Sequence, residues 1–273
     1  MGRGCSANAV LAALLIACAI LTCAVPQAAA QEMFRFLDLK SDDFTKADMT
    51  RAEIEAALAG TDATKVVDLS AKRLNGLDLS GLDLRRTKLQ AARLNRANLA
   101  GAKLDGVTLD QAWALDADLT GASLRGAHLF ATQLMGAKLD GADLTGARIA
   151  GDLSRASMRG ARLDRADLSA DMRNQSMGLM RGILRSAKLD GASLEDANLS
   201  RAVLEFASLR DARLKSAKLN GSELAGADFL GADVANADFA DADVTSTRLV
   251  GLRGRDSARN LDRVKNLDRA FRD

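Results

Sequence analysis

The sequence predicts an all-β solenoid of short period, a rod built from many small stacked coils. From Leu69 onward an apolar residue, usually leucine, returns every five residues almost to the end of the chain, as in Leu119, Leu124 and Leu129. A small residue, most often alanine, stands two places before most of these leucines. Self-similarity at a fixed period determines the architecture before any single helix or strand is considered.

A spacing of five residues fits neither of the common elements. A helix face recurs after about 3.6 residues and a strand face after about 2. Leucines five apart would therefore surround a helix, or alternate between the two faces of a strand. The chain must turn a corner in each group of five, and steps such as Gly-Ala-Asp-Leu-Thr-Gly at 141–146 suit tight turns. Four corners close a square coil of about twenty residues, with coils stacked about 4.8 Å apart. The leucine and the small residue point inward, and the other three residues face water.

Several groups of five share the pattern Ala, then Asp or Asn, then Leu or Phe, followed by two variable residues. They are A-N-L-A-G (97–101), A-D-L-T-G (117–121 and 142–146), A-N-L-S-R (197–201) and A-D-F-L-G (227–231). This pattern resembles the pentapeptide-repeat family, and the resemblance covers residues 67–251. It implies a right-handed quadrilateral β-helix, to which the flanking sequences add a short helical cap at both ends.

Residues 1–30 have the features of a secretory signal peptide. Arg3 is the only charge, an apolar run covers 9–25, and an A-x-A site places cleavage after Ala30. All three cysteines lie in this segment: Cys5, Cys18 and Cys23. A mature chain would therefore have no thiol chemistry, and we expect an exported protein, in the bacterial periplasm or alternatively secreted or in an organelle lumen. Two other outcomes stay open, a lipid anchor at Cys18, where Leu-Ile-Ala-Cys resembles a lipobox, and an uncleaved membrane anchor.

Residues 31–66 form an N-terminal segment that is expected to contain a capping helix. Thr50 followed by Glu53 is a capping-box pattern, and an apolar stripe after it ends at Gly60. Solenoids need such caps, because an open terminal coil exposes apolar surface and unpaired backbone.

The repeat is disturbed once, over residues 149–179. Two steps shorten to four residues, one of them from Leu168 to Met172, and the step from Met172 to Leu179 lengthens to seven. These changes cancel, so we expect local bulges and a small loop over 173–178 rather than a domain boundary.

Residues 252–273 lose the period of five and are predicted to form a C-terminal amphipathic helix. Its apolar face would consist of Leu261, Val264, Leu267, Ala270 and Phe271. The stretch before it is acidic and the segment itself is basic, so we expect the helix to fold over the last coil. The alternative is that the same apolar face forms a homodimer.

The sequence contains no constellation of residues that predicts catalysis. His128 is the only histidine and stands in an outward position, with no nucleophile at a matching spacing. There is no cluster of cysteine and histidine with the spacing of a zinc site, no P-loop, and no dinucleotide-binding glycine pattern. We therefore predict no catalytic residue, no cofactor and no metal site, and a protein that is not an enzyme.

One outward cluster is a candidate partner patch. It consists of Trp113, Leu115, Phe130 and Met135. Exposed aromatic and methionine side chains on a polar surface are typical of protein contacts. Local packing is the alternative, with Trp113 turning inward to fill the space beside Ala114.

Together these features predict an exported, non-enzymatic rod that acts as a scaffold or protein–protein interaction module. The alternative is a DNA-mimicking topoisomerase-binding protein, because some members of the family that the chain resembles are acidic rods. Against it, the formal net charge is +2 and basic residues interleave with the acids. Nucleic acid is not an expected partner, since no sustained basic stripe appears. No stable membrane span is expected after signal removal.

Overall fold

The computed structural model of the chain describes residues 37–60, 65–172 and 180–273. The chain divides into two compact units, Met1–Ser41 and Asp42–Asp273, and the fold described below is that of the second. The expectations for residues 1–30, including cleavage after Ala30 and lipidation at Cys18, lie outside the described residues.

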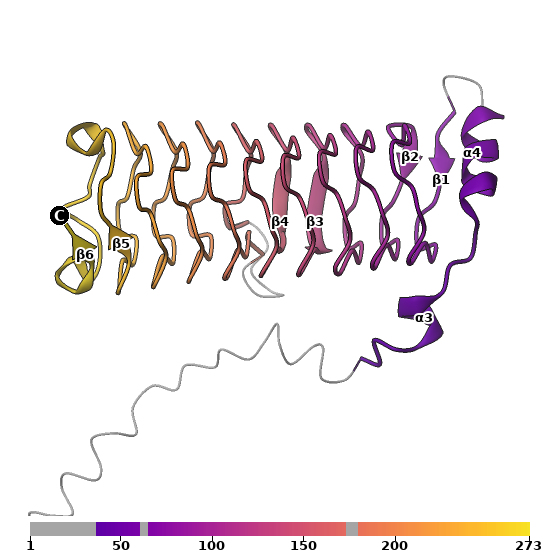
Figure 1. Cartoon of the computed structure of the whole chain (residues 1–273), viewed down its shortest axis with the longest axis horizontal. Helices are drawn as coiled ribbons and strands as arrows, with labels where there is room; N and C mark the ends of the chain where they lie inside the picture. Colours follow the sequence, from indigo (N-terminus) through magenta and orange to yellow (C-terminus); the bar gives the residue numbers. More distant parts are fainter. Residues whose placement is uncertain (1–36, 61–64, 173–179) are drawn as a thin grey trace, which may run out of the picture. The chain divides into compact units, whose positions relative to one another are not determined.

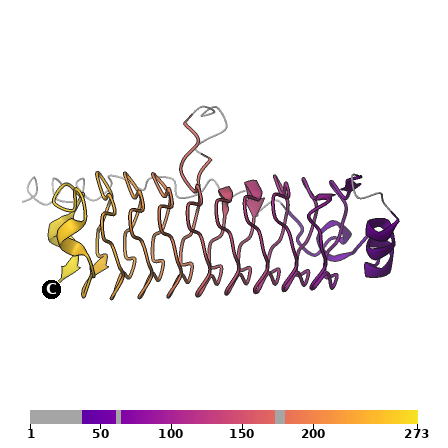
Figure 2. The same cartoon turned by 90° about the horizontal axis from the view of Figure 1, so that it is seen from above.

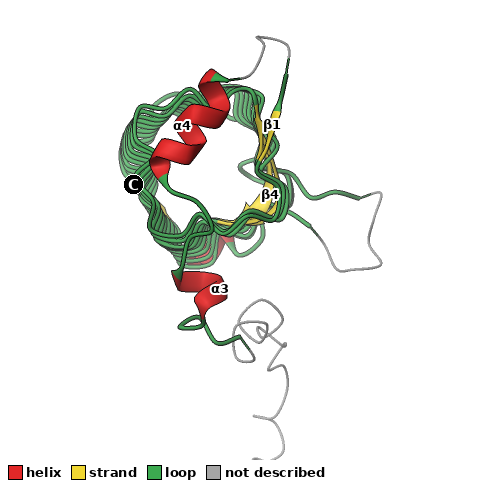
Figure 3. Ribbon diagram, turned by 90° about the vertical axis from the view of Figure 1, so that its right-hand side faces the viewer, coloured by secondary structure: helices red, strands yellow, loops and turns green. Residues whose placement is uncertain are grey.

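The second unit is a parallel β-solenoid with four-sided coils. Outward residues pair with residues one coil later, as in Arg73 with Arg93 and Asp78 with Asn98, each pair being 20 residues apart. Each regular side of a coil is therefore one group of five residues, as the leucine period predicts. The coils lie side by side along the rod in Figure 1, and Figure 3 shows them from the end as a ring.

Regular strands are short because each side of a coil turns a corner after a few residues. The parallel pairs are β1 (Val67–Asp68) with β2 (Thr87–Lys88), β3 (His128–Gln133) with β4 (Arg148–Asp152), and β5 (Arg248–Leu249) with β6 (Phe271–Arg272). Between these pairs the ladder continues through single paired residues on each side.

The core is the inside of the tube. Leu124 and Ala122 represent its two kinds of inward position, and both are fully buried. Burying a leucine contributes about 2 kcal/mol before chain entropy is counted. The second inward position is almost always alanine in the repeats, because a narrow tube that already holds four large side chains in each coil has no room for another.

The corners explain why Asp or Asn stands before the leucine. Asp118 accepts a hydrogen bond from the backbone N–H of Thr120 at 3.0 Å, and Asn98 accepts one from Ala100 at 3.1 Å. This side-chain contact satisfies an N–H at the corner that the ladder leaves free. The next residue adopts a left-handed conformation, so glycine is common there, as at Gly121 with φ 63°.

The N-terminal cap is α4 (Arg51–Ala59), which crosses the opening of the first coil (Figure 3). The capping box predicted from Thr50 and Glu53 is present, since the N–H of Thr50 donates to Glu53 Oε2 at 2.7 Å. Ile54 is fully buried and joins the core of the rod. A second helix, α3 (Asp42–Thr45), lies outside the ring.

The disturbed region differs from the prediction. The shortened step before Leu153 is present, but Met172 is 47% exposed and does not line the tube. In the structure Leu184 follows Leu168 in the core, because Ile183 pairs with Asp152 of the coil before. The expected loop over 173–178 and the expected leucine at 179 lie outside the described residues.

Residues 171–172 and 180–181, here called the extruded segment, leave the coil instead of contributing sides to it. Asp171 N–H donates to the carbonyl of Met180 at 2.8 Å, which closes the base of this extruded segment. Figure 2 shows the chain on either side of residues 173–179 projecting away from the rod.

The C-terminal amphipathic helix predicted over 252–273 is wrong. The segment forms one more coil, whose outward residues Arg253, Arg259, Lys265 and Phe271 recur every six residues instead of every five. The extra residues are taken up by two short 3-10 turns, η1 (Arg255–Ser257) and η2 (Leu267–Arg269).

The helix prediction failed because apolar residues three apart fit a helix face and a six-residue side equally well. The basic segment nevertheless lies on the acidic coil before it, as its charge predicts. Arg253, Arg259 and Lys265 stack on Asp233, Asp238 and Asp243 of the preceding coil.

Candidate interaction surfaces

Trp113 lies on the outer face of the rod in a row with Arg73 and Arg93, one coil apart. Residues 42–48, here called the strap, pack on this row. The ring of Phe44 meets Trp113 edge-on, with centroids 5.2 Å apart, and is 8% exposed. The guanidinium of Arg93 lies over the same phenyl ring at 5.1 Å. Trp113 therefore does not turn inward beside Ala114; it packs against the chain's own N-terminal segment.

Polar contacts hold the strap on both sides of Phe44. Asp43 Oδ2 is 2.8 Å from Arg93, and the carbonyl of Asp43 accepts from Asn75 Nδ2 at 3.0 Å. Asp48 Oδ1 accepts from Arg73 Nε at 2.8 Å. This hydrogen bond lowers the pKa of the Asp48 carboxyl below its ordinary value. We call the receiving residues, Arg73, Asn75, Arg93 and Trp113, the cradle.

The cradle is ordered by a ladder of asparagines rather than by the strap alone. Asn75 is buried, and its Oδ1 accepts hydrogen bonds from the backbone N–H and the Nδ2 of Asn95 at 3.1 and 2.9 Å. Asn95 Oδ1 in turn accepts from the N–H of Leu115 at 3.0 Å. The amide that receives the strap is thus fixed by the corner of the next coil.

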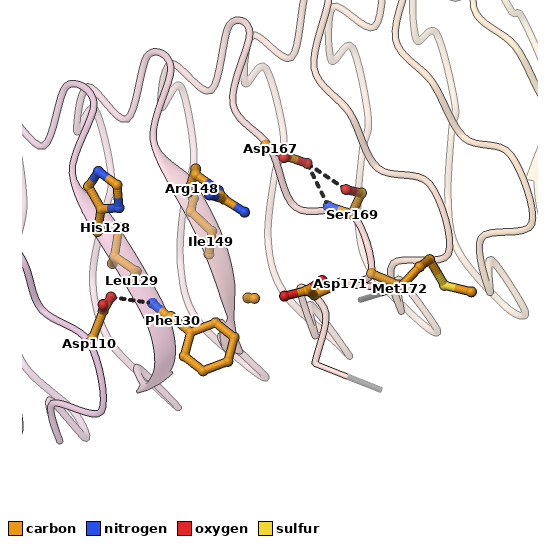
Figure 4. A pocket seen from close by; sticks show the side chains of 12 residues that line it. Asp110, His128, Leu129, Phe130, Arg148, Ile149, Asp167, Ser169, Asp171 and Met172 are labelled. Atoms are coloured by element: carbon orange, nitrogen blue, oxygen red, sulfur yellow. Dashed lines mark hydrogen bonds between the residues drawn. The ribbon is translucent and has the colours of Figure 1, made fainter. Parts of the chain in front are cut away.

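A second feature is a groove of about 440 Å³ beside β3 and β4 (Figure 4). His128, Arg148 and Asp167 form one outward row along it, each one coil after the other. The ring of Phe130 lies below this row, and Met172 lies at the end next to the extruded segment.

The groove arises where two irregularities of the repeat meet. The pairing of β3 with β4 shifts register between Phe130 and Gln133. A Cβ atom on Gly151 would lie 2.4 Å from the carbonyl oxygen of Thr132, which only glycine avoids. Beyond it the chain leaves the coil after Leu168, and this departure leaves one wall of the groove open.

The polar groups that line the groove differ in how far they are already engaged within the chain. Two of its carboxylates already accept backbone hydrogen bonds, Asp110 from the N–H of Phe130 at 2.9 Å and Asp167 from the N–H of Ser169 at 3.1 Å. Within the described residues Arg148 is exposed and forms no ion pair. The side chains left to face the groove are therefore the guanidinium of Arg148, the imidazole of His128 and the ring of Phe130. Side chains of these kinds are common in contacts between polypeptides.

The predicted partner patch is divided by the fold. Trp113 belongs to the cradle, while Phe130 lines the groove on another side of the coil. Leu115 and Met135 are half-buried and stack one coil apart, as their spacing predicts. Partner contact by these residues stays a prediction. Phe44 was missed because it lies outside the repeat; its sequence signal is an aromatic residue directly after two acids, ahead of the capping helix.

Other sites in the described ranges are few. A smaller hollow of about 190 Å³ opens at the C-terminal coil among Leu249, Leu252, Leu261 and Leu267. No group of three or more His, Cys, Asp or Glu side chains in the described part of the chain is placed to hold a metal ion. Among those same residues, no helix has the length and apolar character needed to cross a membrane.

Comparison with known proteins identifies the family. A profile described as pentapeptide repeats matches the chain in 8 copies, over residues 68–112, 116–149, 184–215 and 207–245. The chain therefore belongs to the pentapeptide-repeat family, and the right-handed β-helix of that family is its fold. The gap in the matches between 149 and 184 coincides with the extruded segment and the groove.

Among solved structures, HetL from the cyanobacterium Nostoc sp. strain PCC 7120 is similar at 28% identity. The match covers 82% of this chain and 94% of HetL, with a TM-score of 0.57, and HetL is described as involved in heterocyst differentiation regulation. QnrB1, a plasmid-mediated fluoroquinolone resistance protein, matches at 17% identity over 77% of this chain and 91% of its own, with a TM-score of 0.41. No curated protein sequence matches the chain significantly.

Proposed function

We propose that the chain is an exported, non-enzymatic rod that acts as a scaffold or protein–protein interaction module. The groove beside Phe130 carries this proposal. It interrupts the repetitive outer surface and offers an aromatic ring, an exposed guanidinium and an imidazole in about 440 Å³. Concave sites that combine an aromatic anchor with a few polar groups are typical of recognition surfaces.

The chemistry of the groove favours binding over catalysis. Ser169 Oγ donates to Asp167 at 2.6 Å. Within the described ranges His128 makes no hydrogen bond to a hydroxyl or carboxylate. A nucleophile next to a base that a third group orients is the arrangement that catalysis by a side chain requires. A regulatory involvement such as that of HetL fits a rod that acts by contact with another protein.

Export is tested on the protein recovered from cells. Cleavage after Ala30 gives an intact mass that begins at Gln31, and we expect this species outside the cytoplasm. A mature chain that begins at a lipid-modified Cys18 would instead indicate a membrane-anchored protein. Recovery of the complete chain from the cytoplasm alone would contradict export.

Interaction through the groove is tested by affinity capture from the exported fraction with three matched baits. The wild-type chain is compared with Phe130→Ala and with Phe206→Ala; Phe206 is 64% exposed and lies outside the groove lining. We expect a protein that the wild type and Phe206→Ala retain and Phe130→Ala loses. Equal retention by all three would contradict the role of the groove, and capture of a topoisomerase would favour the alternative function.

A further inference from the structure

We propose that the cradle is a recognition site for short acidic segments with a phenyl side chain, and that the strap occupies it in cis. This inference adds a partner class to the proposed function but concerns a different surface from the groove. It holds whether or not the chain is exported.

The strap shows what the cradle recognises. It presents one phenyl ring, Phe44, and a carboxylate from the residue before it, Asp43. The Arg93 guanidinium lies over this ring, and Trp113 meets the ring edge-on. Arg93 therefore contacts both groups at once, by cation–π contact with the ring and by an ion pair with the carboxylate.

A second carboxylate, Asp48, extends the contact. Arg73 reaches it with its Nε and also donates its backbone N–H to Asp48 Oδ2 at 2.9 Å. Asn75 Nδ2 donates to the carbonyls of Asp43 and Lys46 at 3.0 and 2.8 Å. The recognised pattern is thus an acid followed directly by phenylalanine, on a backbone turn, with another acid five residues after the first.

The cradle residues are held in position by the rod itself. Arg73, Arg93 and Trp113 are held one coil apart by the parallel ladder of the rod, and the amide of Asn75 is fixed by Asn95. A rigid set of groups loses little conformational freedom on binding, which favours recognition of a partner in trans.

The strap has little stability of its own apart from its contacts with the cradle. Its helix α3 has four residues, and Phe44 is the one buried residue in it. A single helical turn is not stable alone. The side chains of Asp43 and Arg93 remain 56% and 30% exposed, so water screens their ion pair. Beyond these contacts, the tether gives the strap an effective concentration on the order of millimolar. To displace the strap, a separate partner with the same groups must be present above that concentration or must bind the cradle more tightly than the strap does.

The test uses the only tryptophan of the chain, Trp113, as its reporter. The full chain and its Phe44→Ala variant are titrated with a synthetic peptide of residues 41–49. We expect Phe44→Ala to shift the Trp113 emission to longer wavelength, and the peptide to reverse this shift with saturation. The wild type should bind the peptide at least about tenfold more weakly, because the tethered strap competes.

Three controls make the result specific. A peptide with alanine in place of its phenylalanine should fail to restore the emission of Phe44→Ala. Adding Arg93→Ala to that variant should abolish peptide binding, while its circular dichroism melting curve shows that the rod is intact. Phe206→Ala should leave the emission of the wild type unchanged.

The proposal is overturned if Phe44→Ala leaves the emission unchanged, if the peptide does not bind this variant, or if both peptides bind equally. None of these results bears on capture by the groove, so failure here is separate from failure of the proposed function.

Discussion

Leu124→Ala tests the central energetic claim about the tube, that its stability comes from inward leucines stacked coil on coil. Leu124 is fully buried, and its inward position repeats one coil earlier at Leu104 and one coil later at Leu144. The substitution removes three carbons at about 0.8 kcal/mol each, or about 2.4 kcal/mol of transfer free energy. The cavity left in a rigid tube raises the expected loss to about 3 kcal/mol.

The assay is urea unfolding followed by backbone circular dichroism and by the emission of Trp113. We expect a lower midpoint for Leu124→Ala in both signals. Leu230→Ala is the matched control, because Leu230 is an outward, half-buried leucine and its loss should cost less than about 1 kcal/mol. If the two variants lost equal stability, burial inside the tube could not be the source of its stability.

Three further predictions concern the corners, the close approach of two coils and the N-terminal cap. Asp118→Ala is expected to cost about 1 kcal/mol in urea unfolding because a corner N–H loses its acceptor, and Asp118→Asn should recover most of it; equal losses would refute the corner role. Gly151→Ala should cost about 1–3 kcal/mol, since the new methyl group meets a backbone oxygen; an unchanged Tm would contradict this. Hydrogen bonds from Arg73 and from the Thr50 N–H lower the pKa of Asp48 and of Glu53 below their ordinary values of 3.8 and 4.5. Their stabilisation is complete above those values and is lost as the pH falls through the lowered pKa values, so Trp113 emission should shift below about pH 4 before the rod unfolds. Simultaneous changes in emission and circular dichroism would argue against release of the strap and the cap before the rod unfolds.

The C-terminal coil shows where periodicity stops being sufficient. Leu261, Val264 and Leu267 are three apart, which a helix face accepts and a six-residue side accepts equally. The preceding coil favours the six-residue side over the helix, because the backbones of Asp238 and Asp243 pair with those of Arg259 and Lys265. Local sequence cannot weigh those pairings, because their partners are more than 20 residues away.

The disturbed region shows the same limit in another form. Counting residues from Ile149 restores the five-residue phase correctly, yet it cannot tell a bulge from an extrusion, since both preserve the phase. The structure resolves this by pairing Ile183 with Asp152, which removes Met172 from the core. The groove depends on that pairing, so no motif in the sequence could have located it.

The sequence by itself determined the coil, its inward leucines and alanines, the capping box and the family. Each of these features depends on the spacing of residues that are close in the sequence. Because the repeat contains the same spacing many times, the pattern can be recognised from the sequence. Only the tertiary structure decided which outward side chains meet. Phe44 reaches Trp113 and Arg93 across more than one coil of the rod, and Phe130 faces a groove opened by a departure of the chain 40 residues later. Contacts of this kind form because stacked coils place residues that are distant in the sequence side by side. A local sequence pattern does not contain that information.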